Sequence, residues 1–172
     1  MSDKAKTNPS RARHLKDVAQ WDREIDVAIV GFGGAGGCAA IEAADAGSAV
    51  IIFELASASG GSTAMSSAEF YMGGGGGTRV QQACGFEDKT EDMFTYMMMA
   101  AGPQADEAKI RKYCDNSQEH FNWLCELGVP FKDSFHEERG IMCLTDDGLL
   151  YTGSEKAYPF KEHAKPAPRG HN

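Results

Sequence analysis

Three glycines at the spacing G-x-G-x-x-G form the first pattern with chemical meaning: Gly31, Gly33 and Gly36. Between a strand and a helix, the first glycine permits a tight turn, the second lets the backbone approach a pyrophosphate, and the third lets the helix pack closely on the strand. A helix that begins at Gly34 and Ala35 then points free N–H groups and the positive end of its dipole at the phosphates. All five residues are therefore predicted to contact a dinucleotide.

An acidic residue follows this loop at the distance expected for a ribose contact. Glu54 lies 18 residues after Gly36, within the usual window for the carboxylate that hydrogen-bonds an adenosine ribose, and it would repel a 2′-phosphate. The alternative is a glycine-rich turn in an unrelated α/β protein, which the combined spacing disfavours. NAD and FAD share this ADP-recognition half, so the motif alone leaves both cofactors open.

The segment after Glu54 distinguishes the two cofactors. Gly60-Gly61-Ser62-Thr63 offers close backbone approach, two hydroxyls and exposed N–H groups where the flavin mononucleotide half of FAD would lie. A flexible Gly/Ser linker is the alternative interpretation. The spacing from Glu54 favours FAD, and the predicted contacts are Gly61, Ser62, Thr63 and Ser66.

The segment from Gly60 to Thr63 resembles the glycine-glycine-serine-threonine segment of the succinate dehydrogenase and fumarate reductase flavoprotein superfamily. The likeness extends over residues 26–63, 123–131 and 151–171, and it is greatest toward relatives of 3-ketosteroid Δ1-dehydrogenase. It implies an FAD-dependent oxidoreductase that transfers a hydride in a C–C desaturation or in an enoate or fumarate-type reduction. The implied substrate is a small molecule, a steroid-like ketone or a dicarboxylate, and the electron partner stays unknown.

The sequence departs from this superfamily at two places after the ribose-binding acid. Leu55 replaces a residue that is commonly basic, and Ser67-Ala68-Glu69 stands where the superfamily usually has paired glycines that line the flavin ring. A carboxylate near that ring would disfavour an anionic reduced flavin, unless Glu69 points to solvent.

The resemblance also suggests catalytic candidates near the C-terminus. In the ketosteroid branch a hydride passes to the flavin and a proton to a tyrosine, which makes Tyr158 the candidate base; a half-buried packing tyrosine is the favoured alternative. In a fumarate-reductase-like protein, His163 and His171 with Arg169 would serve as acid or anion-binding groups. Because Pro and Lys surround them, a solvated polar tail is the favoured interpretation.

The elements that position the glycine motif are a strand at 25–30, a helix at 35–46 and a strand at 49–53. This order predicts an α/β, Rossmann-like fold of the glutathione-reductase type for binding FAD or NAD(P), present in incomplete form. Residues 56–78 are predicted to form a cofactor-contacting loop, with no helix or strand across the five glycines at 73–77.

Two helices and a hairpin are expected further along the chain. One helix covers 90–101 with Thr90 as its N-cap, and the hairpin pairs 140–144 with 149–152. The methionines at 97–99 and Trp123 are expected to be core residues without a cofactor role. The second helix covers 105–127, ends at Gly128, and buries one face at the three-and-four spacing of Ile110, Tyr113, Cys114, Ser117, Phe121, Leu124 and Leu127.

The 172 residues have room for one domain. Residues 1–24 are predicted to be a mobile polar arm, and 25–172 the N-terminal part of an FAD-binding domain whose capping domain and C-terminal FAD segment are absent. We therefore expect a fragment without turnover of its own. A non-catalytic ADP-binding module and an NAD-dependent dehydrogenase are the alternative functions.

Net charge and cysteine usage limit which binding partners and which cellular compartment we expect for this protein. The net charge is −8, and beyond residue 24 there are 11 basic against 21 acidic residues, which argues against nucleic-acid binding. No apolar run approaches the roughly 20 residues of a membrane span, and the basic N-terminal stretch lacks the apolar run of a secretory signal. The cysteines contain no CxxC pair and His14, His120 and His136 form no metal pattern, so we expect a cytoplasmic protein without a metal site.

Overall fold

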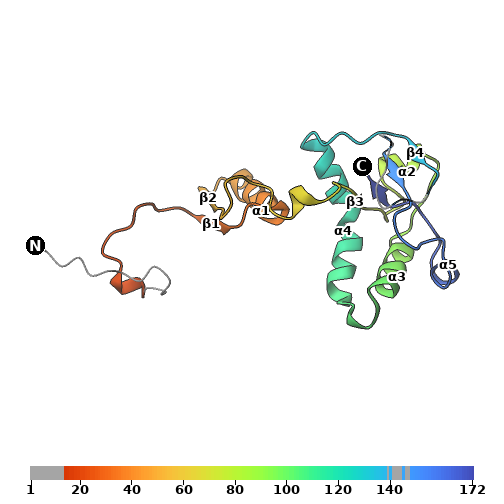
Figure 1. Cartoon of the computed structure of the whole chain (residues 1–172), viewed down its shortest axis with the longest axis horizontal. Helices are drawn as coiled ribbons and strands as arrows, with labels where there is room; N and C mark the ends of the chain where they lie inside the picture. Colours follow the sequence, from red (N-terminus) through yellow and green to blue (C-terminus); the bar gives the residue numbers. More distant parts are fainter. Residues whose placement is uncertain (1–13, 139, 141–144, 146–147) are drawn as a thin grey trace, which may run out of the picture. The chain divides into compact units, whose positions relative to one another are not determined.

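The computed structural model describes residues 14–138, 140, 145 and 148–172 (Figure 1). The chain divides into two compact units: Met1–Met65, the first unit, and Ser66–Asn172, the second unit. This division falls inside the stretch for which the sequence predicts one FAD-binding domain, and that domain assignment stays a prediction. Residues 1–13 of the predicted arm lie outside the described residues.

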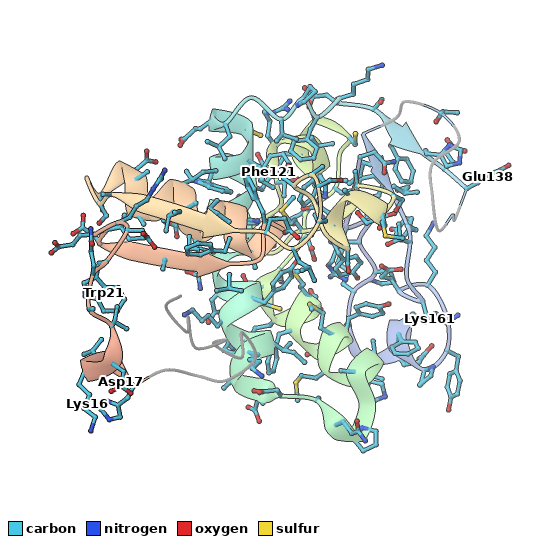
Figure 2. The ribbon with its side chains drawn as sticks, turned by 60° about the vertical axis from the view of Figure 1, so that its left-hand side comes forward. Lys16, Asp17, Trp21, Phe121, Glu138 and Lys161 are labelled. Atoms are coloured by element: carbon cyan, nitrogen blue, oxygen red, sulfur yellow. The ribbon has the colours of Figure 1, made fainter. Side chains whose placement is uncertain are left out.

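The first unit is a strand, a helix and a strand. β1 (Val27–Val30) and β2 (Val50–Phe53) pair in parallel, with Val27 opposite Val50 and Val30 opposite Phe53. α1 (Gly34–Asp45) connects them and contacts both strands, as a crossover between parallel neighbours must. The predicted order of elements is confirmed, and each boundary lies within two residues of its predicted place. Before β1 stands a short 3-10 helix, η1 (Leu15–Asp17), and Figure 2 labels Lys16, Asp17 and Trp21 in this stretch.

The second unit combines two longer helices with a small sheet. α3 (Thr90–Ala101) and α4 (Glu107–Glu126) are joined by the 3-10 helix η3 (Gly102–Gln104) and contact each other. The sheet has the strand order β3-β6-β5-β4. These strands are β3 (Phe70–Tyr71), β4 (Phe135–His136), β5 (Leu149–Leu150) and β6 (Gly170–His171), and the remaining elements are η2 (Thr63–Met65) of the first unit, α2 (Arg79–Ala83) and α5 (Phe160–His163).

The core of the second unit lies between α4 and the sheet, with Phe121 fully buried among its neighbours (Figure 2). The predicted buried face of α4 is confirmed for Cys114, Ser117, Phe121 and Leu124. It is wrong for Tyr113 and Leu127, which are 41% and 48% exposed because they lie at the margins of the face. The core cluster consists of Met72, Val80, Phe121, Leu124, Phe131 and Leu149, with Trp123 packed against it as predicted.

Both ends of α4 follow the capping rules, whereas the N-terminus of α3 does not. Asp106 caps α4 by accepting a hydrogen bond from Lys109 N, and Gly128 adopts φ +90° where the helix stops. The prediction that Thr90 caps α3 is wrong: the N-cap is Lys89, and Thr90 is the first helical residue. The Thr90 hydroxyl instead accepts a hydrogen bond from Gly75 N at 2.9 Å, so a long-range partner displaces the local cap.

The C-terminal stretch differs most from the sequence prediction. A solvated tail is wrong for Arg169 and His171, both fully buried, although His163 is exposed. β6 lies inside the sheet and pairs antiparallel with β3 on one side and β5 on the other. β5 also pairs in parallel with β4, while residues 141–144 of the predicted hairpin lie outside the described residues.

Candidate functional site

The glycine loop of the first unit has the geometry that the motif predicts. Gly31 adopts φ +97°, a conformation that suits glycine, and its N–H donates to Phe53 O at 2.7 Å. A Cβ on Gly36 would overlap the carbonyl oxygen of Gly31 and lie 3.4 Å from Ile29 Cγ2. Gly36 is therefore required for the close approach of α1 to β1.

The N-terminus of α1 presents backbone donors. Gly33 is the N-cap, and the first helical hydrogen bond runs from Gly37 N to Gly33 O at 2.9 Å. The amides of Ala35 and Gly36 precede that bond and so have no partner within the helix. A Cβ on Gly33 would lie 3.7 Å from its nearest neighbours, so the protein leaves space beside this residue. These features suit an anion at the helix N-terminus.

The Gly60 to Thr63 segment folds back onto the glycine loop. Gly60 N donates to Phe32 O at 2.6 Å, and Thr63 Oγ1 accepts from Gly34 N at 3.0 Å. Gly60 and Gly61 adopt φ +122° and +51°, which glycine permits. Two bonds to the nucleotide loop distinguish this segment from a free linker, and they bring Gly61, Ser62 and Thr63 beside Gly33 and Gly34.

Glu54 is fixed by two backbone donors. Its Oε2 accepts from Phe32 N at 2.7 Å and its Oε1 from Ala56 N at 2.8 Å. These amides, Ala56 first, lower the pKa of Glu54, so the group is ionised at neutral pH. Each carboxylate oxygen has room for another donor. Glu54 thus holds the glycine loop and remains able to accept a ribose hydroxyl; the sequence predicted only the ribose contact.

The amides of the five glycines at 73–77 donate hydrogen bonds within the protein. The amides of Gly73, Gly74 and Gly75 donate to Ser117 Oγ, Asp88 Oδ2 and Thr90 Oγ1, and those of Gly76 and Gly77 donate to Asp88 O and Gly74 O, all at 2.8–3.1 Å. With these N–H groups already used, the run is a hydrogen-bonded turn rather than a phosphate cradle. The predicted absence of helix and strand here is confirmed.

Arg169 and Asp88 form a buried ion pair in the second unit. Arg169 Nε and Nη2 each lie 2.7 Å from an oxygen of Asp88, and the side chains are 0% and 1% exposed. Asp88 thus accepts from two of the three guanidinium nitrogens, Nη1 is buried without a hydrogen-bond partner, and the anion-binding role considered for Arg169 stays a prediction. The sequence did not identify Asp88, which no local pattern connects to a residue 81 positions away.

His171 is a neutral imidazole between two oxygen atoms. Nδ1 lies 2.9 Å from Arg169 O and Nε2 lies 2.8 Å from Thr78 Oγ1. A carbonyl only accepts, so Nδ1 carries the hydrogen and Nε2 accepts from the Thr78 hydroxyl. Burial lowers the pKa of His171 to about 4. This residue is part of the core rather than an exposed acid.

The remaining candidates lie in the second unit as well. Tyr158 is 80% exposed, so the expected half-buried packing tyrosine is wrong, and its role as a base stays a prediction. Ser66 accepts a hydrogen bond from Ala68 N at 3.2 Å. On α3, Met97 Sδ lies 3.6 Å from Cys114 Sγ, in keeping with a packing role.

Among the described residues no His, Cys, Asp and Glu group is arranged to hold a metal, and none of their helices has both the length and the apolar character of a membrane span.

Comparison with known families identifies the family to which this chain belongs. Residues 26–168 match the FAD binding domain family. The chain belongs to that family. FAD is therefore its cofactor, and the ADP-binding features of the first unit fit such a group: the unpaired amides of α1, the space beside Gly33 and the ionised Glu54.

Individual relatives of this FAD binding domain are flavoprotein oxidoreductases. A 3-ketosteroid-Δ4-(5α)-dehydrogenase structure from Rhodococcus jostii RHA1, solved with 4-androstene-3,17-dione, is 53% identical with a TM-score of 0.88, covering 94% of this chain and 33% of that one. The 3-oxo-5-alpha-steroid 4-dehydrogenase of Comamonas testosteroni is 31% identical over 90% of this chain and 29% of its own length. The NADH:fumarate oxidoreductase of Klebsiella pneumoniae is 31% identical over 64% of this chain and 12% of its own length. The chain thus spans about a third of the length of its steroid-oxidising relatives.

Proposed function

We propose that the chain forms the ADP-binding part of a Rossmann-like FAD domain in an oxidoreductase that desaturates a steroid-like 3-ketone. The observation that carries the proposal is the first unit, in which a parallel strand-helix-strand presents unpaired amides at the N-terminus of α1 and the ionised carboxylate of Glu54 at the end of β2. The steroid class is favoured because steroid-oxidising relatives match 90% and 94% of the chain, whereas the fumarate oxidoreductase matches 64%.

The residues of the first unit have separate tasks in this proposal. The amides of Ala35 and Gly36 would hold the pyrophosphate at the N-terminus of α1. Glu54 would accept from an adenosine ribose hydroxyl while its two backbone donors fix its orientation. FAD, when bound, supplies the ring that accepts a hydride from the substrate. Tyr158 as proton acceptor, the electron partner, a cytoplasmic location and the lack of nucleic-acid binding stay predictions from the sequence.

The experiment compares two glycines of the same loop and helix. Gly33→Ala places a methyl group in the space beside the helix N-terminus, and Gly37→Ala places one 3.7 Å from the Phe32 ring, within ordinary contact distance. Both variants should fold, because Gly33 has an extended backbone that any residue adopts. We expect Gly33→Ala to weaken ADP and FAD binding at least tenfold, about 1.4 kcal/mol, and Gly37→Ala to bind as the parent does.

Isothermal titration measures the affinity of each variant for ADP and for FAD. The visible absorbance of the purified protein shows whether it retains flavin. Equal affinity of the parent and Gly33→Ala for both ligands would contradict the proposal. A colourless protein whose ADP binding depends on Gly33 would instead indicate a non-catalytic ADP-binding module. Binding of NAD without FAD would indicate a nicotinamide-dependent dehydrogenase.

A further inference from the structure

A cavity of about 410 Å³ lies on one side of α4 in the second unit. Two of its lining residues, Met72 and Ser117, are buried. The other described lining residues lie on one face of α4, because they recur at the three-and-four spacing of a helix: Lys109, Lys112, Tyr113, Asn116 and His120. A volume of this size is typical of small-molecule sites in proteins.

Hydrogen bonds to the chain around β3 fix two residues of this cavity. The Tyr113 hydroxyl donates to Tyr71 O at 2.5 Å, and Ser117 Oγ accepts from Gly73 N at 3.0 Å. The polar atoms of both side chains are therefore used within the protein. What remains for a ligand at this end of the cavity is apolar contact with the Tyr113 ring, which is 41% exposed, and with Met72 beside it. The cavity is thus formed in advance and has an apolar base.

The charges that line the cavity are positive. Lys109 and Lys112 are both exposed, and the described lining residues include no Asp or Glu. Lys109 Nζ lies 3.1 Å from Asp106, which balances its charge, whereas Lys112 forms no ion pair with another residue that the structure describes. The whole chain has a net charge of −8, so a cavity lined by lysines without an acid departs from its general composition. An anionic group would complement the charge of Lys112.

We propose that this cavity binds a small organic anion, a carboxylate or a sulfonate attached to a ring-sized apolar body. The ammonium of Lys112 attracts the anionic group as a point charge at the end of a flexible stem. The apolar body lies on the Tyr113 ring beside Met72. His120 bounds the cavity further along α4, where its ring stacks on Trp123 with the centroids 5.4 Å apart. No residue of the glycine loop takes part, so the proposal is independent of FAD binding.

The experiment uses two probes that differ in charge alone. Anilinonaphthalenesulfonate is the anionic probe, and N-phenylnaphthylamine has the same aromatic rings without the sulfonate. Each probe is titrated into the full chain labelled with nitrogen-15, and the amide shifts of residues 109–120 give the affinity for the cavity. The amides of residues 31–37 are followed separately, so a probe bound at the glycine loop is not counted.

Three variants test the role of Lys112. Lys112→Gln removes the charge, Lys112→Arg retains it, and Lys161→Gln removes the charge of an exposed lysine of α5, labelled in Figure 2, that does not line the cavity. We expect the sulfonate to bind the parent, Lys112→Arg and Lys161→Gln about two- to fivefold more tightly than Lys112→Gln, as for an exposed ion pair. The neutral probe should bind all four proteins equally and more weakly than the sulfonate binds the parent. Added salt should weaken the binding of the sulfonate alone.

Two results would overturn the proposal. Equal affinity of the sulfonate for the parent and for Lys112→Gln, or equal affinity of the two probes for the parent, would show that the cavity does not select an anion. Shift changes confined to amides outside 109–120 would show that the probe binds elsewhere and that the cavity is not its site. Because Lys112 is exposed, none of these variants is expected to disturb folding, and an unchanged melting temperature verifies this.

Discussion

Replacing Asp88 by asparagine should be one of the most damaging single substitutions in the second unit. The variant leaves the guanidinium of Arg169, 0% exposed, without its two 2.7 Å carboxylate contacts, and it weakens the acceptor for Gly74 N at 3.1 Å. Breaking a buried ion pair by removing one partner costs about 3–5 kcal/mol. That is a large share of the roughly 5–15 kcal/mol by which a domain is stable.

The chain contains a matched control for this prediction. Arg111 also donates two hydrogen bonds to one carboxylate, that of Glu91, at 2.6 and 3.1 Å, but Glu91 is 74% exposed. Glu91→Gln should leave the urea midpoint nearly unchanged, because solvent screens an exposed pair. Unfolding followed by circular dichroism gives both free energies. If Asp88→Asn unfolded at the parent's midpoint, or if Glu91→Gln were equally damaging, the argument from burial would fail.

Three further predictions concern the nucleotide loop and the core. Glu54→Gln should weaken ADP binding about 10- to 150-fold, the range for a charged hydrogen bond, and an unchanged titration would place the ribose elsewhere. Gly36→Ala should cost about 1–3 kcal/mol as overpacking, because its Cβ overlaps Gly31 O; a melting temperature equal to that of the parent would show that α1 can shift. The pKa of His171 falls from 6.5 to about 4 on folding, so the unfolded chain binds the proton first and stability declines as pH drops from 6.5 to about 4. The loss is about 3 kcal/mol, and a urea series over this range should show a shallower decline in His171→Gln.

The sequence predicted the parts of the fold whose determinants are local. Gly31 to Gly36 specify a turn by steric needs that any strand-helix junction imposes, and the required glycine at 36 follows directly. The buried face of α4 is likewise encoded by its three-and-four spacing. In both cases the residues that determine the structure are close to one another in the sequence.

The C-terminal strand could not be predicted because its determinants are distant. The composition around Arg169 and His171 is typical of a polar tail. Their burial depends on distant partners: Asp88, 81 positions from Arg169, and Thr78, 93 positions from His171. The same applies to Thr90, whose hydroxyl serves Gly75 instead of its own helix. Local composition predicts that such polar residues are exposed. A hydrogen-bond partner far along the chain offsets the free-energy cost of burying them, so they can lie in the core.

The burial of Glu69 bears on the effect that its carboxyl would have on a bound flavin. The sequence predicts that a carboxylate in this segment disfavours an anionic reduced flavin unless it points to solvent. Glu69 is partly buried, its Oε2 is shielded from solvent, and burial raises its pKa. A raised pKa favours the neutral carboxyl, so the repulsion that Glu69 would exert on a neighbouring anion is smaller than the sequence alone suggests.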